Sequence, residues 1–208
     1  MAHTQQLKIM KKGFAPKGHF FQTVMAHFAR PASLHRLLAV FTGAACEQWI
    51  NCEAFMALRG RCPNAWIYPE WGKRDVALFA AEDDECPSLL METKVLYANY
   101  PLSKQRQKLE ALANQLEQCR KLVGPDAPKN AVVGLVVGFD WTVVSSGLEN
   151  RPRPKVPERD RLPRRLLEEC GLENAFGHTG GRRLEGRVKS QNGHIDVKVR
   201  FEMVRLAQ

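Results

Sequence analysis

The sequence predicts an α/β protein of the α+β type, in which a central mixed sheet is flanked by helices. Apolar residues at helical spacing fill residues 19–60, three short strand-like runs follow in residues 64–98, and then come one more helix and one apolar strand. A length of 208 residues with 44% hydrophobic residues is sufficient for a buried core. We divide the chain into an N-terminal helical segment (1–41), a core (42–148) and a basic C-terminal extension (149–208) packed on the same domain.

The N-terminal part is predicted to be helical. "GHFFQTVMAHFARP" has helical apolar spacing that Pro31 ends. "SLHRLLAVF" and "TGAACEQWINCEAFMALRG" are predicted as two further helices, with Ser33 and Thr42 as N-caps and Gly60 as a C-terminal stop. In the last of these helices we expect the buried stripe to be Ala45, Trp49, Cys52 and Met56.

The middle of the chain changes to strand periodicity. "NAWIYPEW", "DVALFAA" and "SLLMETKVLYA" are separated by short turns, which favours an antiparallel meander. "LSKQRQKLEALANQLEQCRKLVG" has the apolar stripe of an amphipathic helix. "NAVVGLVVGFDW" is continuously apolar, as is typical of a strand buried on both faces.

The C-terminal part is rich in basic residues. Residues 149–165 hold four prolines and seven Lys or Arg, which predicts an extended basic arm. "RRLLEECG" is predicted as a short helix, and residues 186–206 as a basic β-hairpin that turns at Asn192 and Gly193. Between them, "GHTGGRR" is predicted as a flexible loop; alternatively its backbone amides and two arginines grip a phosphate.

Charge distribution favours a polyanion as the partner. The net charge is +9, made up of +6 in residues 1–36, −3 in residues 37–150 and +6 in residues 151–208. An ordinary basic surface is the alternative. No apolar run is long enough for a membrane span or a leader, so we expect a cytoplasmic protein that does not bind membranes. The cysteines lack zinc-site spacing, and no phosphate-binding loop for ATP is present.

Charged residues interrupt two of the predicted strands. Glu92 and Lys94 are two residues apart and therefore share one face of their strand. If the preceding strand pairs with it antiparallel, Asp75 reaches the same face. Two neighbouring carboxylates repel each other, so their closeness favours a divalent cation, and hard oxygen ligands favour Mg²⁺ or Mn²⁺.

The spacing of Asp75, a gap of sixteen residues, and then Glu92-Thr93-Lys94 resembles the PD-(D/E)XK nuclease superfamily, over residues 42–140. This resemblance implies a restriction-endonuclease-like core. It also implies that Asp75 and Glu92 bind the metal, that Thr93 adds its backbone carbonyl, and that Lys94 is the catalytic lysine. Arg74 stands where the nominal pattern has proline.

The family often has a glutamate on the helix before the sheet and a polar residue on the helix after the lysine strand. Glu53 borders the expected apolar stripe and is the preferred candidate for the catalytic and metal site, with Glu47 as its alternative. Gln115 borders the stripe of the following helix in the same way, and Gln118 and Arg120 remain open.

Taken with the resemblance, these observations predict a Mg²⁺-dependent deoxyribonuclease, most simply an endonuclease, with DNA favoured over RNA only through the family. The basic N-terminal segment and the arginines and lysine of two C-terminal segments would bind the nucleic acid backbone: Arg151, Arg153, Lys155, Arg182 and Arg183. Cutting both strands would favour a homodimer. A catalytically inactive nucleic-acid-binding or regulatory protein with the same fold is the alternative, and a basic interaction protein without a polyanion partner is a third hypothesis.

Overall fold

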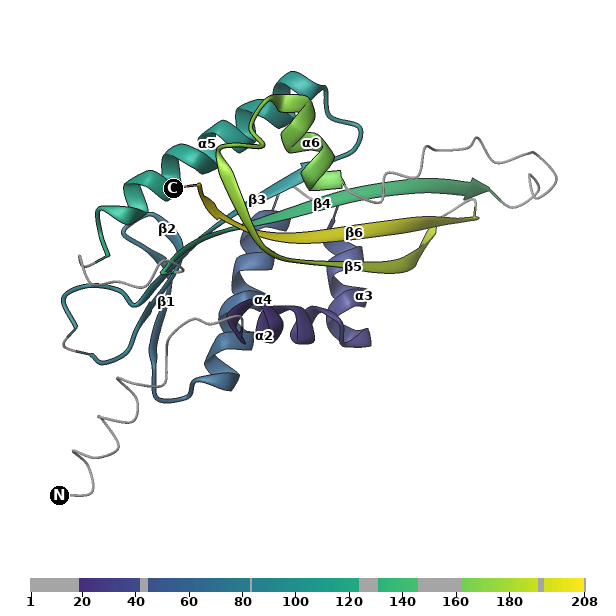
Figure 1. The fold of residues 1–208 in the computed structure, drawn as a ribbon. Coiled ribbons are helices and arrows are strands. Elements are labelled where there is room, and N and C mark those ends of the chain that lie inside the picture. The colour runs from purple at the N-terminus through teal and green to yellow at the C-terminus, as the bar shows by residue number, and fades with distance from the viewer. Residues whose placement is uncertain are drawn as a thin grey trace.

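A computed structural model describes residues 19–41, 45–82, 84–123, 131–145, 162–190 and 193–207. Within them a six-stranded sheet has the strand order β1-β2-β3-β4-β6-β5 (Figure 1). In chain order the elements are α2 (His19–Phe28), α3 (Pro31–Val40), α4 (Cys46–Arg61), β1 (Trp66–Trp71), β2 (Arg74–Phe79), β3 (Leu89–Tyr97), α5 (Leu102–Arg120), β4 (Val132–Ser145), α6 (Leu162–Cys170), β5 (Phe176–Ser190) and β6 (Gly193–Leu206). The predicted α+β class is confirmed.

The sheet is mixed, as predicted. Strands β1, β2 and β3 form an antiparallel meander, and β4 lies parallel to β3 because the chain crosses back through α5. Strand β6 then pairs antiparallel with β4 along the length of both, and β5 pairs with β6. The C-terminal hairpin is therefore part of the central sheet and supplies the second neighbour of β4.

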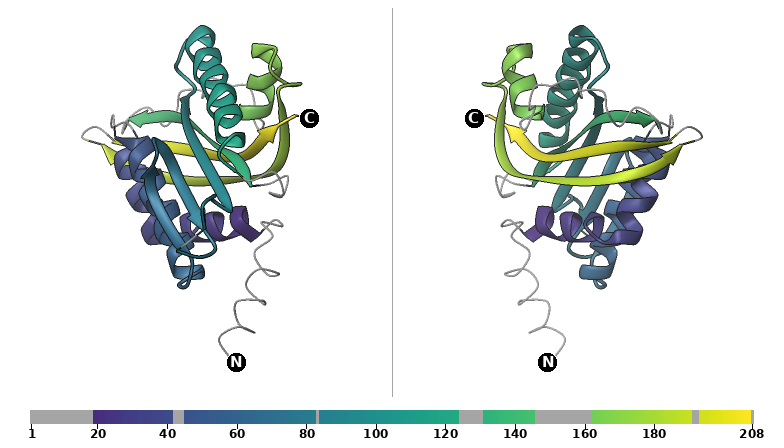
Figure 2. Two further views of the ribbon diagram at one scale, coloured as in Figure 1. Left: turned by 90° about the vertical axis from the view of Figure 1, so that its left-hand side faces the viewer. Right: turned by 90° about the vertical axis from the view of Figure 1, so that its right-hand side faces the viewer.

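Helices cover both faces of the sheet. Helices α2, α3 and α4 lie on one face, and α5 and α6 lie on the other (Figure 2). The two faces bury separate apolar clusters. The first contains Phe28, Leu37, Ile50, Met91, Leu135 and Phe201, and the second contains Leu90, Leu112, Leu116, Val136 and Leu166.

The starts and ends of two N-terminal helices differ from the predictions. Helix α3 begins at Pro31, so Ser33 is a buried residue of its first turn and not its N-cap. Proline suits this position because the first helical N–H groups have no partner within the helix. Helix α4 begins at Cys46 and continues through Gly60 to Arg61, and the predicted N-cap Thr42 lies outside the described residues.

The buried face of α4 is also rotated relative to the prediction. Ala45, Cys52 and Met56 are exposed and Trp49 is half-buried. The residues that face the sheet are mostly small, and include Cys46, Ile50, Ala54, Ala57 and Leu58. A shift from Ala45 to Cys46 turns the stripe by about 100°. The large apolar residues misled the prediction because α4 approaches the sheet through small side chains.

The segment predicted as a flexible loop is part of strand β5. The glycines of "GHTGGRR" reflect close contacts: a Cβ at Gly181 would lie 2.8 Å from Glu202 Oε2, and one at Gly180 would lie 2.7 Å from the Phe21 ring. A larger residue at Gly180 would require the Phe21 ring to move, and one at Gly181 would require the Glu202 carboxylate to move. No helix within the described ranges is both long and apolar enough to cross a membrane.

Candidate functional site

The candidate site lies where strands β2 and β3 part. Their ladder ends at the pair Val76 and Met91, one residue before Asp75 and Glu92 would face each other. Even-numbered N–H groups of β3 donate to β4, as Leu90 N does to the carbonyl of Ala131. The odd-numbered N–H groups therefore point toward β2 and lose their strand partner where β2 turns away.

Two carboxylates accept these N–H groups. The backbone N–H of Thr93 donates to Asp75 Oδ2 at 2.6 Å, and that of Val95 donates to Glu47 Oε2 at 3.2 Å. Asp75 comes from β2, whereas Glu47 comes from the first turn of α4. The parting of the strands therefore positions two acidic side chains beside the Glu92-Thr93-Lys94 segment without leaving backbone donors unpaired.

Glu92 is almost fully buried, with 1% of its surface exposed. The Cys119 thiol on α5 lies 3.5 Å from Glu92 Oε1 and donates to it, and Arg74 Nη1 lies 3.6 Å from the same oxygen. Burial, and after it the charge of Asp75, raise the Glu92 pKa from 4.5 to about 7. Burial also raises the Asp75 pKa, although the Thr93 N–H and Lys94 act in the opposite direction. A cation between the two carboxylates would relieve both effects.

Lys94 projects from β3 on the same face as Glu92. Its Nζ donates to Glu47 Oε1 at 3.2 Å and to the Thr93 carbonyl at 2.9 Å. Lys108 Nζ approaches the other Glu47 oxygen at 3.9 Å. Glu47 therefore holds the Lys94 ammonium and also accepts a hydrogen bond from the backbone of the same strand.

Helix α5 closes the site with polar residues. Cys119 contacts Glu92 and Lys108 approaches Glu47, so α5 runs antiparallel to β3 and Gln115 lies between these two contacts. Gln115 Oε1 is buried and has no hydrogen-bond partner within the described part of the chain. Of the two residues left open beside it, Gln118 accepts from Arg74 Nη2 at 3.4 Å and so contacts the partner of Glu92, whereas Arg120 donates to the carbonyl of Leu206 at 3.0 Å.

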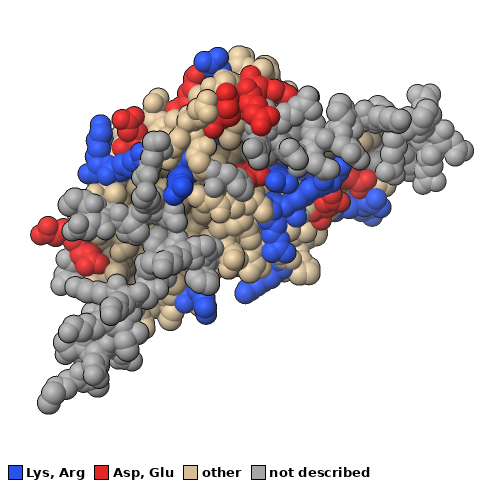
Figure 3. All heavy atoms as spheres, in the orientation of Figure 1, with Lys and Arg blue, Asp and Glu red and all other residues tan. Residues whose placement is uncertain are grey.

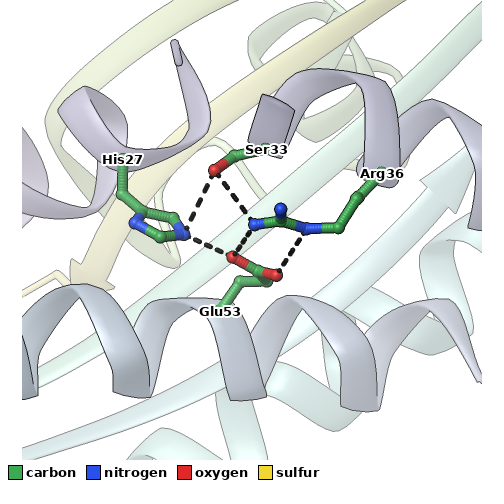
Figure 4. Close-up of polar contacts among 4 residues, drawn as sticks. All are labelled: His27, Ser33, Arg36 and Glu53. Carbon is green, nitrogen blue, oxygen red and sulfur yellow. Dashed lines mark hydrogen bonds and ion pairs between the residues drawn. The ribbon is translucent and has the colours of Figure 1, made fainter. Parts of the chain in front are cut away.

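Glu53 belongs to a different cluster (Figure 4). Its carboxylate forms a short contact with His27 Nε2 and accepts from Arg36 Nε at 3.2 Å, while Ser33 lies beside both partners. Burial acts to raise the Glu53 pKa, but hydrogen bonds from His27 and Arg36 outweigh it and hold that pKa below its usual value. This cluster ties α2, α3 and α4 together. The structure brings Glu47, and not Glu53, to the candidate site.

The predicted nucleic-acid-binding arginines do not act as one group. Arg182 pairs across the sheet with Phe201 and Arg183 with Arg200, so the two side chains point to opposite faces and cannot grip one phosphate together. Arg183 forms an ion pair with Glu185, and Figure 3 shows acidic side chains among the basic ones over β5 and β6. The predicted contacts Arg151, Arg153 and Lys155 lie outside the described residues.

The donor set suits a hard cation such as Mg²⁺. Asp75, Glu92 and the Thr93 carbonyl supply oxygen from adjacent strands, and burial, as the largest cause, raises the pKa of both carboxylates. Within the described ranges no three or more His, Cys, Asp and Glu side chains are grouped for a metal. Mg²⁺ commonly binds through one or two carboxylates and completes its shell with water and phosphate oxygens, so two carboxylates are compatible with it.

Comparison with known proteins adds no identification. The chain matches no family model, no curated protein and no solved structure at a significant level.

Sequence reasoning missed three participants: Cys119, Arg74 as the partner of Glu92, and Lys108. The placement of Cys119 on the predicted apolar stripe of α5 could have indicated that its thiol faces β3. The contact of Arg74 with Glu92 could not have been derived, because simple strand alternation puts it on the face opposite Asp75.

Proposed function

We propose that the protein is a Mg²⁺-dependent nuclease that hydrolyses DNA phosphodiester bonds, with a restriction-endonuclease-like core. The observation that carries this proposal is the meeting of Asp75, Glu92 and Lys94 on one face of the sheet, where β2 and β3 part. A buried carboxylate and a half-buried one beside an ammonium held by Glu47 favour a site for a cation and a phosphate. The mixed sheet with helices on both faces is compatible with this fold.

Each residue has a role that follows from its contacts. Asp75, Glu92 and the Thr93 carbonyl would hold the metal, which when bound polarises the phosphodiester and lowers the pKa of water. Lys94 would orient the attacking water or neutralise charge on the phosphate, and Glu47 is the positioning residue that keeps its Nζ in place. Cys119 and Arg74 orient Glu92, and the buried amide oxygen of Gln115, on the same helix as Cys119, has no hydrogen-bond partner within the described residues.

Lys94→Ala and Asp75→Asn test the proposal directly. Wild-type protein is expected to cut supercoiled and linear DNA with Mg²⁺ and not with EDTA. Both variants should lose about 10²-fold or more in cleavage rate, because each removes a charge that acts on the transition state. Both should still bind DNA in EDTA. Lys104→Ala is the control, since Lys104 is an exposed lysine of α5 that stacks on Tyr100. Cleavage by the wild type in EDTA, or cleavage by either variant at the wild-type rate, would contradict the proposal.

A second candidate function is nucleic acid binding without catalysis. It is favoured by the absence of a third acidic metal ligand within the described residues and by the hold that Glu47 already has on Lys94. The same experiment separates the two, because an inactive protein would bind DNA in EDTA and show no metal-dependent cleavage.

A further inference from the structure

Four aromatic residues lie together on the β1–β2 hairpin, and we call them the hairpin patch: Trp66, Tyr68, Trp71 and Phe79. Phe79 belongs to the apolar cluster on the α5 side of the sheet, and Trp66 is its cross-strand partner. Tyr68 is two residues further along β1 and shares that face. The hairpin patch is thus on the same side of the sheet as the candidate site.

Two rings of the hairpin patch are exposed and fixed in orientation. Trp66 and Tyr68 are 39% and 38% exposed, and their ring planes are 19° apart with centroids separated by 6.5 Å. The Tyr68 ring meets Phe79 edge-on at 5.7 Å, and Phe79 meets Trp71 at 5.2 Å. Rings supported in this way retain little rotamer freedom, so a flat ligand could stack on them at low entropic cost.

The hairpin patch adjoins the carboxylates. Tyr68 pairs with Ala77, which is two residues from Asp75 on the same face of β2. Tyr68 is therefore the diagonal neighbour of Asp75, at about 7–8 Å between backbone positions. Helix α5 packs mainly on β3, β4 and β6, and so it leaves this part of the face to the aromatic rings.

Charge indicates which flat ligand fits. Residues 102–121, which form α5 and its end, contain five Lys or Arg and two Glu, and Lys108 among them approaches Glu47 at the site, within a chain of net charge +9. A neutral sugar would stack on the rings but gain nothing from this charge. A nucleic acid strand offers both phosphates and flat bases, and each base presents its face only when it is not stacked in a duplex.

We propose that Trp66 and Tyr68 stack on unpaired nucleobases of the strand whose phosphate enters the site at Asp75, Glu92 and Lys94. The placement of that phosphate rests on the proposed function. The substrate class follows from the rings: DNA with a single-stranded segment, such as a flap, an overhang or a splayed end. Intact duplex would reach the same site without the contribution of the two rings.

Binding in EDTA tests the stacking without cleavage. Wild-type protein is titrated with three fluorescent ligands: a thymidylate strand of about 12 nucleotides, an abasic strand of equal length, and a blunt duplex. Anisotropy should show about hundredfold tighter binding to the thymidylate strand than to the abasic one, because each of the two rings contributes about tenfold. Trp66→Ala and Tyr68→Ala should each weaken thymidylate binding about tenfold and leave duplex binding unchanged. Trp66→Phe should retain most of the affinity because it keeps a ring face.

Met56→Ala is the matched control, because Met56 is an apolar side chain on α4, across the sheet, with 59% exposure. Equal affinity for abasic and thymidylate strands would overturn the proposal with wild-type protein alone, even if the alanine variants fail to fold. Equal losses on duplex and single strand would also overturn it. So would alanine variants that bind normally but change the sedimentation coefficient, since the hairpin patch would then join two copies of the chain.

The two proposals fail separately. Ring-dependent binding without metal-dependent cleavage would remove the nuclease and retain base stacking. Metal-dependent cleavage together with equal affinity for the thymidylate and abasic strands would support the nuclease proposal and contradict the stacking proposal.

Discussion

Replacing Glu92 by Gln is expected to stabilise the protein at high pH. Glu92 has 1% exposure and a pKa of about 7 in place of 4.5, so folding favours its protonated form. Such a group contributes stability that is full below about pH 4.5 and is lost as the pH rises through 7. At pH 8 this pKa shift lowers the free energy of unfolding of the wild type by about 3 kcal/mol. Glutamine keeps the shape and carries no charge, so this cost disappears in the variant.

Urea denaturation of both proteins measures the effect. Near pH 8 the variant should be more stable by about 3 kcal/mol, equivalent to a shift in midpoint of about 1 M, and near pH 4 the two should agree. Mg²⁺ at high pH should stabilise the wild type and leave the variant unchanged, because the variant lacks one metal carboxylate. Glu117→Gln, at an exposed position of α5, is the control and should show no pH-dependent difference.

One result would refute this reasoning. A stability difference between Glu92→Gln and wild type that stays constant from about pH 4 to pH 8 would mean that Glu92 has an ordinary pKa in the folded protein. Burial would then not destabilise the charged form of Glu92, and a cation would not be needed to offset it.

The remaining predictions concern individual side chains. Glu47→Gln should lower the cleavage rate about tenfold or more with little loss of stability. Glu53→Gln should leave cleavage intact and lower the free energy of unfolding by about 1–3 kcal/mol, because Glu53 ties three helices together. Loss of cleavage in Glu53→Gln but not in Glu47→Gln would restore Glu53 to the site. Cys119→Ala removes a hydrogen bond that favours the charged form of Glu92, so the Mg²⁺ affinity measured by calorimetry should reach its maximum at a higher pH than in the wild type. An unchanged dependence of Mg²⁺ affinity on pH would contradict this. Arg182→Ala should leave the slope of DNA affinity against salt unchanged, because its side chain is on the face opposite the carboxylates; a shallower slope would show that DNA wraps the sheet edge.

Strand geometry was the part of the site that the sequence could predict. Alternation puts Glu92 and Lys94 on one face, and antiparallel pairing brings Asp75 beside them, as the structure has them. These relations depend on only two adjacent strands. The buried stripe of α5, with Leu112, Leu116 and Cys119, could also be predicted, because its apolar residues recur at helical spacing; a role for Gln115 beside it stays a prediction.

The acidic residue of α4 could not be predicted in this way. Trp49 and Met56 suggested a stripe that the fold does not bury, since α4 contacts the sheet through alanines, a cysteine and an isoleucine. The choice between Glu47 and Glu53 depended on that stripe. It also depended on His27 and Arg36, which lie far away in the sequence and hold Glu53 elsewhere.

The first part of strand β5 could not be predicted from the sequence for a related reason. Glycine usually marks a turn, but Gly180 and Gly181 make room for Phe21 and Glu202. Such close contacts between elements leave no periodic signal in the local sequence.

The insertion of β6 between β4 and β5 has a consequence for the order of folding. Strand β4 supports β3, which carries Glu92 and Lys94, and β4 gains its second neighbour only from Gly193–Leu206. A nascent chain that stops short of this strand leaves β4 with a bare apolar edge, and pairing across so long a separation is slow. The scaffold beneath the carboxylates is therefore completed late in folding.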